Sequence, residues 1–242
     1  MPRIDPPGGE VDWPRHEGTL GVVGVAPWAT LDFLRAFYAR IPARKDWHYP
    51  RVIADINTKL PSRGRHLELG EADPSPWIAQ TIAEMQEQGA SVVVVPCNTA
   101  HLLFERWSQG HRVHLPHIVI ETATALAELG ARHVAALTSA SLRQHGLYER
   151  VFDSMAMQTV ELDDVEADLV ARVIDAVKQG GCIPADLHSD VRVLFQRLKH
   201  DGVQGVALGC TELAALATAA RSTGLVVSES NDALAAAALR LL

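Results

Sequence analysis

Two short segments of the chain share one pattern, and this pattern limits the folds that the chain can adopt. Residues 92–95 and 205–208 are uninterrupted apolar runs, which are typical of strands in a parallel sheet that is covered on both faces. Each run leads through a helix-breaking residue to a cysteine, Cys97 or Cys210, with a threonine within the next two positions. The two copies lie nearly half the chain apart. They predict two similar α/β halves, each presenting one cysteine at the carboxyl end of a strand, where ligands bind in such sheets.

Strand and helix signals alternate along the rest of the chain, which predicts an α/β fold with parallel sheets. Thr30, just behind Pro27, suits the cap of the first helix. Residues 118–120 form a weaker strand candidate. The other expected strands are 19–25, 51–56, 91–95, 133–137, 205–208 and 225–227. The main expected helices are 30–40, 76–89, 164–179 and 191–200.

Charge and composition argue against several classes of function. The formal net charge is -7, whereas non-specific nucleic-acid binding needs a basic surface. No apolar stretch approaches the roughly 18 residues that span a bilayer, so we expect neither nucleic-acid nor membrane partners. Residues 1–17 lack the apolar centre of a signal peptide and are interpreted as a flexible N-terminal extension, which favours a cytoplasmic location. The 3 cysteines are too few for a disulfide framework and are expected to be free thiols.

Both Cys97 and Cys210 are expected where a strand ends and a helix begins. Unpaired backbone N–H groups and the positive end of the helix dipole favour a thiolate at such a place. They can lower a thiol pKa from about 8.5 to roughly 3.5–7.5. A single thiolate could act as a nucleophile. Two on facing edges suggest that one thiolate removes a proton from carbon while the other thiol returns one from the opposite side, which inverts a stereocentre.

Simpler roles apply to several other reactive side chains. An isolated buried cysteine usually behaves as a small hydrophobic residue, but the Asn-Thr and Thr-Glu that follow Cys97 and Cys210 argue against that role. Cys182 lacks this context and is assigned no role. Glu212 is interpreted as a helix cap. Because helix-spaced Cys and His without further ligands are a weak metal signal, we interpret four histidines as packing or solvated residues: His101, His111, His114 and His117.

Five segments together carry a family signature. The two cysteine motifs, at residues 96–101 (PCNTAH) and 209–213 (GCTEL), are specific as a pair. Residues 24–30, 57–63 and 70–76 add weaker support in the same order along the chain. In these segments the chain resembles the aspartate racemase branch of the aspartate/glutamate racemase superfamily. The resemblance covers most of the chain from about residue 18 onward.

The resemblance implies two pseudo-symmetric α/β domains, each with a mainly parallel sheet flanked by helices, and an active site in the cleft between them. We place the first domain at 18–117 plus 222–242 and the second at 118–221. The resemblance also implies a homodimer that acts on a small-molecule amino acid without pyridoxal phosphate or any other cofactor. No lysine has a recognisable pyridoxal phosphate or dinucleotide signature beside it; the four are Lys45, Lys59, Lys178 and Lys199.

The activity implied by the resemblance is racemisation of aspartate or glutamate, with Cys97 and Cys210 as the two acid–base groups. Arg63 takes the place of an arginine that meets the side-chain carboxylate of an acidic substrate, and a guanidinium can grip a carboxylate with two hydrogen bonds. No metal is expected. The remaining substrate-binding residues are assigned as Asn57, Asn98, Thr99, Thr138 and Thr211.

Three departures from the family pattern bear on the substrate. Ala26 stands where the family's first loop has a glycine, and residues 229–231 read Glu-Ser-Asn where relatives often have Asp-Ser-Thr. No lysine occurs near residues 185–186, where many relatives have one that helps to bind an acidic side chain. Two other functions therefore remain open. One is another reaction of the superfamily, such as hydantoin racemisation or maleate isomerisation, and the other is non-catalytic binding of a small acid.

Overall fold

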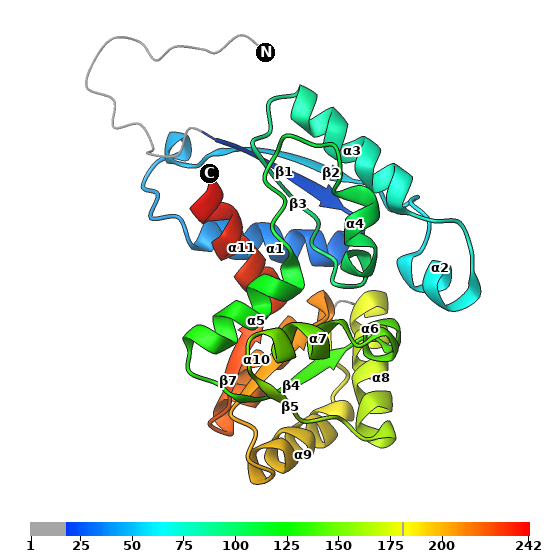
Figure 1. The fold of residues 1–242 in the computed structure, drawn as a ribbon. Helices are drawn as coiled ribbons and strands as arrows, with labels where there is room; N and C mark the ends of the chain where they lie inside the picture. Colours follow the sequence, from blue (N-terminus) through cyan, green and yellow to red (C-terminus); the bar gives the residue numbers. More distant parts are fainter. Residues whose placement is uncertain (1–17, 181) are drawn as a thin grey trace.

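Two parallel sheets, one in each half of the molecule, organise the chain (Figure 1). The structure is a computed structural model that describes residues 18–180 and 182–242. The first sheet has the strand order β2-β1-β3, with β1 (Thr19–Gly24), β2 (Arg51–Ile56) and β3 (Val92–Val94). The α-helices of this part of the chain are α1 (Pro27–Ala39), α2 (Arg63–Leu69), α3 (Ser75–Glu87) and α4 (Phe104–Trp107).

The second sheet has the order β5-β4-β6-β7. Its strands are β4 (His133–Thr138), β5 (Gln158–Thr159), β6 (Gly205–Gly209) and β7 (Val226–Glu229). The remaining α-helices are α5 (Ile118–Glu128), α6 (Ala140–His145), α7 (Leu147–Ser154), α8 (Asp164–Gly180), α9 (Leu187–His200), α10 (Ala217–Ser222) and α11 (Ser230–Leu241). Three short 3₁₀ helices complete the elements: η1 (Asp46–His48), η2 (Thr99–Leu103) and η3 (Thr211–Leu216). The expected α/β class with two parallel sheets flanked by helices is confirmed.

Alternating side chains of the strands explain why helices cover both faces of each sheet. In β1, Leu20 and Val22 pack with α1 and α11, whereas Val23 packs with α3 on the opposite face. In the second sheet, Val206 and Leu208 pack into a cluster with α8 and α9. The cluster around Leu20 also includes residues of α5, α7 and β6, so one continuous core joins the two halves.

The structure corrects several expectations about single elements. Residues 118–120 begin helix α5 and do not form a strand; three apolar residues in a row fit a buried helix as well as a strand. Thr30 does not cap α1, because its hydroxyl donates back to the carbonyl of Ala26. Helix α2 arises from the polar stretch around Arg63 that carried no helix signal in the sequence analysis.

The last part of the chain divides between the two halves. Residues 222–242 were expected in the first domain, but β7 pairs with β6 and so extends the second sheet. Only α11 returns to the first half, where it packs against α1 and also contacts α5. The chain therefore crosses from the second half back to the first half after β7. No helix in the described part of the chain is long and apolar enough to cross a membrane.

Candidate active site

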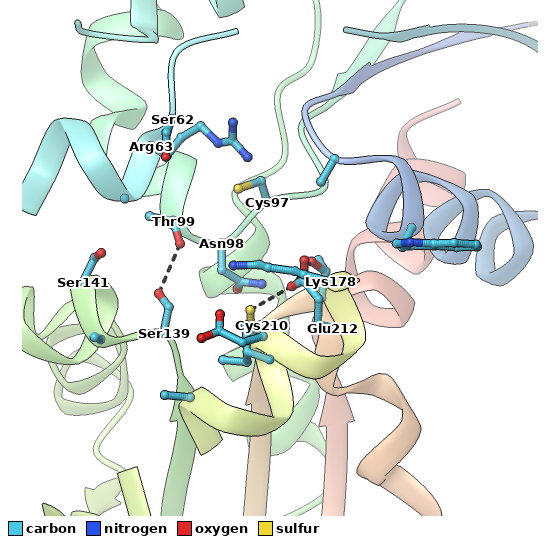
Figure 2. A pocket seen from close by; sticks show the side chains of 18 of the residues that line it. Ser62, Arg63, Cys97, Asn98, Thr99, Ser139, Ser141, Lys178, Cys210 and Glu212 are labelled. Atoms are coloured by element: carbon cyan, nitrogen blue, oxygen red, sulfur yellow. Dashed lines mark hydrogen bonds between the residues drawn. The ribbon is translucent and has the colours of Figure 1, made fainter. Parts of the chain in front are cut away.

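A cavity of about 610 Å³ has walls from both halves of the molecule. Cys97, just beyond β3, and Cys210, just beyond β6, both line it. The two cysteines that the sequence pattern paired are thus brought to one space, each from the carboxyl end of a strand in a different sheet. Figure 2 shows the Cys97 and Cys210 side chains in this cavity, with Asn98 beside them.

Cys97 is half-buried and lies in a tight turn, in which its own N–H donates to the Val95 carbonyl at 2.7 Å. The carbonyl of Cys97 is 2.9 Å from Nδ1 of His101. The following helix η2 is a 3₁₀ segment of 5 residues. Such segments are short and have poor hydrogen-bond geometry, so the dipole of η2 stabilises a thiolate at Cys97 less than the dipole expected from an α-helix would.

Cys210 has a different environment. It is 8% exposed, and its Sγ donates a hydrogen bond to Oε2 of Glu212 at 2.9 Å. The hydroxyl of Thr211 donates to the same oxygen at 3.0 Å. Burial, and then the charge of Glu212, raise the pKa of the Cys210 thiol well above its ordinary value, while the charge of Lys178 acts in the opposite direction. These effects act against the thiolate expected at Cys210 and favour the protonated thiol.

Glu212 is the residue whose role the sequence analysis misjudged. It was interpreted as a helix cap, but its carboxylate is buried and accepts hydrogen bonds from the Cys210 and Thr211 side chains. A carboxylate held against a thiol can accept its proton. The adjacent Thr-Glu in the sequence was a usable signal, because a polar pair directly after a cavity cysteine places a carboxylate within reach of it.

Asn98 is fixed from two sides. Its Nδ2 donates to Oγ of Ser230 at 2.9 Å, and its Oδ1 accepts from the hydroxyl of Tyr148 at 2.8 Å. All three side chains are buried. Burial raises the pKa of Tyr148, which keeps this phenol protonated as a donor. Gly209 makes room for the tyrosine, since a Cβ at this position would lie 2.5 Å from its ring.

Hydroxyl groups from both halves of the molecule line the cavity. Thr99 and Thr211, both predicted, line the cavity. Thr138, also predicted, does not line it; its neighbour Ser139 does, and the Ser139 and Thr99 hydroxyls are 3.2 Å apart (Figure 2). Ser141 and Glu68 of α2 also line the cavity, and Oγ of Ser141 donates to the Glu68 carboxylate. Two hydroxyl-mediated contacts therefore join the first half to the start of α6 beside the cavity.

Arg63 begins α2 and reaches the cavity as predicted. Its Nη2 donates to the carbonyl of Val25 at 3.2 Å, whereas its Nε is buried and has no partner among the described residues. A buried N–H without a partner costs free energy unless a ligand satisfies it. Asn57 is not part of the lining, because its Oδ1 closes a turn by accepting from the N–H of Lys59 at 3.0 Å.

Lys178 is a cavity residue that the sequence analysis missed. A lysine was sought near residues 185–186, but the side chain comes from the last turn of α8 and extends into the cavity (Figure 2). Ala171 and Ile174 line the same cavity, and their spacing to Lys178 places all three on one helix face. That spacing was the available signal. Ala26, the departure in the first loop, also lines the cavity and has φ of -149°, an extended conformation that needs no glycine.

The histidine next to the Cys97 turn is a packing residue. His101 is buried against Phe104, Trp107 and His117. Burial lowers the pKa of His101 to about 3 and the pKa of His117 to about 4, so both imidazoles are neutral at physiological pH. Within 18–180 and 182–242, the structure holds no group of three or more side chains that could bind a metal ion.

Known proteins share both the sequence signature and the fold. The model of a family described as Asp/Glu/Hydantoin racemase matches residues 21–238. A broad specificity amino-acid racemase, RacX of Bacillus subtilis, is 27% identical over 96 residues, which are 40% of this chain and 41% of that relative. The alignment thus spans about two fifths of the relative's length.

Solved structures reproduce the fold over nearly the whole chain. Aspartate racemase of Picrophilus torridus superposes with a TM-score of 0.81 and 22% identity, covering 92% of this chain and 93% of its own. An aspartate racemase homologue of Pyrococcus horikoshii gives 0.71 with 18% identity, covering 92% and 98%. Glutamate racemase RacE1 of Bacillus anthracis gives 0.68 with 14% identity, covering 93% and 81%. At these identities the likeness shows the two-domain fold.

Proposed function

The chain belongs to the Asp/Glu/hydantoin racemase family, and we propose that it is a cofactor-independent amino-acid racemase in which Cys97 and Cys210 exchange the Cα proton. One observation carries this proposal: a cysteine from each of the two sheets lines the same cavity. Two-base inversion needs an acid and a base on opposite faces of the carbon. In this proposal the first sheet supplies Cys97 on one face of the substrate carbon and the second sheet supplies Cys210 on the other.

Burial of Cys210 and its contact with Glu212 both favour the thiol at this cysteine. In the resting site Cys210 is the thiol, and Cys97 acts as the base for one enantiomer. The Cα–H bond breaks as Cys97 takes the proton, and the Cys210 S–H bond breaks as its proton forms the new Cα–H bond on the opposite face. For the other enantiomer the roles reverse. Cys210 must first lose its proton, which the Glu212 carboxylate at 2.9 Å is placed to accept, and Cys97 must gain one from solvent. The Cys210 thiolate then takes the Cα proton, and the Cys97 S–H bond breaks as its proton forms the new Cα–H bond.

Two cationic side chains in the cavity favour an amino acid that has a second carboxylate in its side chain. Arg63 and Lys178 line it from opposite halves of the molecule, and the buried Nε of Arg63 has no partner in the part of the chain that the structure describes. Preorganised charges stabilise negative charge that develops in a transition state. We assign the hydroxyls of Thr99, Ser139 and Thr211, which line the cavity, to the substrate's α-carboxylate and amine. The preferred substrate is accordingly aspartate or glutamate.

Proton exchange tests this proposal directly. Purified protein is incubated in heavy water with L-aspartate, L-glutamate, L-alanine or L-serine, and Cα deuteration and the D-enantiomer are followed by mass spectrometry and chiral chromatography. We expect deuterium at Cα of the D-product from the acidic substrates, with or without a chelator and without added pyridoxal phosphate. Activity on a hydantoin or maleate but on none of the amino acids would overturn the proposal, as would binding without exchange.

A further inference from the structure

Helix α2 carries Arg63 but has little hydrophobic packing of its own. None of its 7 residues is buried, and the helix lies at the edge of the first half, beside η2 and α6 (Figure 1). Leu67 is partly buried against the core of the first half, whereas Leu69 is exposed. Because helices in proteins are stabilised mainly by tertiary packing, α2 needs other contacts to hold its position.

Polar contacts at both ends of α2 take this role. At its start, Arg63 donates to the carbonyl of Val25 in the first half. Near its end, the Glu68 carboxylate accepts a hydrogen bond from Oγ of Ser141 on α6. Among the described residues, this is the only side-chain hydrogen bond that joins α2 to the second half of the molecule. The position of α2 over the cavity therefore depends on a contact between the two halves.

The charge of Glu68 is unexpected in this part of the cavity wall. Glu68 and Arg63 line the same cavity, which we propose binds a substrate with two carboxylates. By its charge alone, Glu68 would repel such a substrate. Its hydrogen bond to Ser141, which is 2% exposed, gives the carboxylate a structural role, since hydrogen bonds to charged groups are stronger than those between neutral groups.

The first turn of α2 lies against the same contact. A Cβ added to Gly64 would be 3.8 Å from both Oγ of Ser141 and Oε1 of Glu68. Gly64 follows Arg63 directly in the chain, and Figure 2 shows Arg63 and Ser141 on facing elements of the cavity. A fixed contact between Glu68 and Ser141 therefore also fixes the backbone from which the Arg63 side chain extends.

We infer that Glu68 is a positioning residue, which anchors α2 to α6 through Ser141 and so holds the Arg63 guanidinium in place for the side-chain carboxylate of the substrate. The anchoring of α2 is independent of any activity, whereas the effect on the substrate rests on the proposed function. The two parts are therefore measured separately.

Substitutions at Glu68 test the effect on the substrate. Glu68→Ala should raise KM for aspartate about tenfold, equivalent to about 1.4 kcal/mol, with kcat nearly unchanged, because a rise in KM alone reports lost substrate binding. Glu68→Gln keeps an oxygen that can accept from Ser141 and removes a negative charge, so it should keep the wild-type KM or lower it. The matched control is Glu84→Ala on α3, an exposed glutamate whose hydrogen bond with Gln80 lies within one helix.

Hydrogen exchange tests the anchoring in the absence of substrate. Backbone exchange of α2 is followed by mass spectrometry in the free protein, with α3 as the internal reference. Glu68→Ala and Ser141→Ala should each speed the exchange of α2 severalfold and leave α3 unchanged. The double variant should be no faster than either single variant, because both substitutions break the same interaction.

Each outcome bears on one part of the inference. Unchanged exchange of α2 in Glu68→Ala, or additive effects in the double variant, would overturn the anchoring. The effect on Arg63 would be overturned by a KM in Glu68→Ala at or below the wild-type value, by the same rise in Glu68→Gln, or by a loss confined to kcat. If the wild type racemised no amino acid, the proposed function would fail. The dissociation constant of aspartate would then replace KM, and the exchange experiment would still decide the anchoring.

Discussion

The segments around Cys97 and Cys210 have the same sequence pattern but different chemistry. Cys97 is half-buried, and its carbonyl contacts a neutral histidine. Cys210 is buried, and its thiol donates to a carboxylate. The pattern of strand, breaker, cysteine and threonine therefore determines where each sulfur lies but not its protonation state. The charged neighbours that shift the pKa of Cys210 are Glu212, two positions further along the chain, and Lys178 from α8.

Removing either cysteine should have the largest effect, because each supplies a proton-transfer group that the other cannot replace. We expect Cys97→Ala and Cys210→Ala each to lower kcat/KM by roughly 10²–10⁴-fold in both directions, the usual contribution of a positioned acid or base. Racemisation is measured from each enantiomer by chiral chromatography. Cys182→Ala, which changes an exposed cysteine outside the cavity, is the control and should be nearly neutral. Racemisation by Cys210→Ala at the wild-type rate would contradict the two-cysteine mechanism.

The next largest effect should come from Arg63, which lines the cavity with a buried, unpaired Nε. Arg63→Ala should cost about 2–5 kcal/mol in transition-state binding of aspartate, as for one broken partner of a buried charge pair. The cost should be much smaller for alanine and serine, which have no side-chain carboxylate. The kcat/KM values of wild type and variant on all four amino acids measure this difference. An equal loss on every substrate would show that Arg63 does not bind the side chain.

Exchanging the carboxylate beside Cys210 tests the difference between the two cysteines directly. The Glu212 charge contributes to the raised pKa of Cys210, so Glu212→Gln should lower that pKa. The thiolate then forms at lower pH, and alkylation of Cys210 by iodoacetamide in the free protein should move to lower pH. Peptide mass spectrometry follows both cysteines in one sample, with Cys97 as the internal reference.

Glu105→Gln, which changes an exposed carboxylate on α4, is the matched control for this experiment and should leave both profiles unchanged. If the Cys97 profile moved as far as the Cys210 profile in Glu212→Gln, the effect would be general, and the specific contact would not explain the pKa of Cys210.

The parts of the site that the sequence predicted are those that depend on local pattern. Buried apolar runs located β3 and β6, and the residues just after them had to lie at the sheet edge, which placed Cys97, Asn98 and Thr211 correctly. Tertiary packing decided the rest. Ser139 replaces Thr138 in the lining, because successive residues at the end of a strand point to opposite sides. The sequence predicted α8 with nearly its observed bounds and placed Lys178 on one face with Ala171 and Ile174. It did not show that the last turn of α8 lies beside the other half of the molecule, because that placement depends on tertiary packing.

The smallest expected effect concerns the buried anchor beside Cys97. Asn98 is held by Tyr148 from α7 and Ser230 from α11, and the segment after Cys210 has no equivalent buried amide among its described contacts. Tyr148→Phe removes one donor and leaves the buried Oδ1 of Asn98 without it, which should cost about 1–3 kcal/mol in the free energy of unfolding. Urea denaturation measures that cost. Tyr38→Phe, at a half-exposed tyrosine with no side-chain hydrogen bond in the described structure, should change stability by much less.

Because the Asn98 amide follows Cys97 directly in the chain, Tyr148→Phe should also loosen Cys97 and speed its alkylation more than that of Cys210. An equal increase in the alkylation rates of both cysteines would indicate a general loss of stability. It would contradict the prediction that Asn98 positions the Cys97 side of the site.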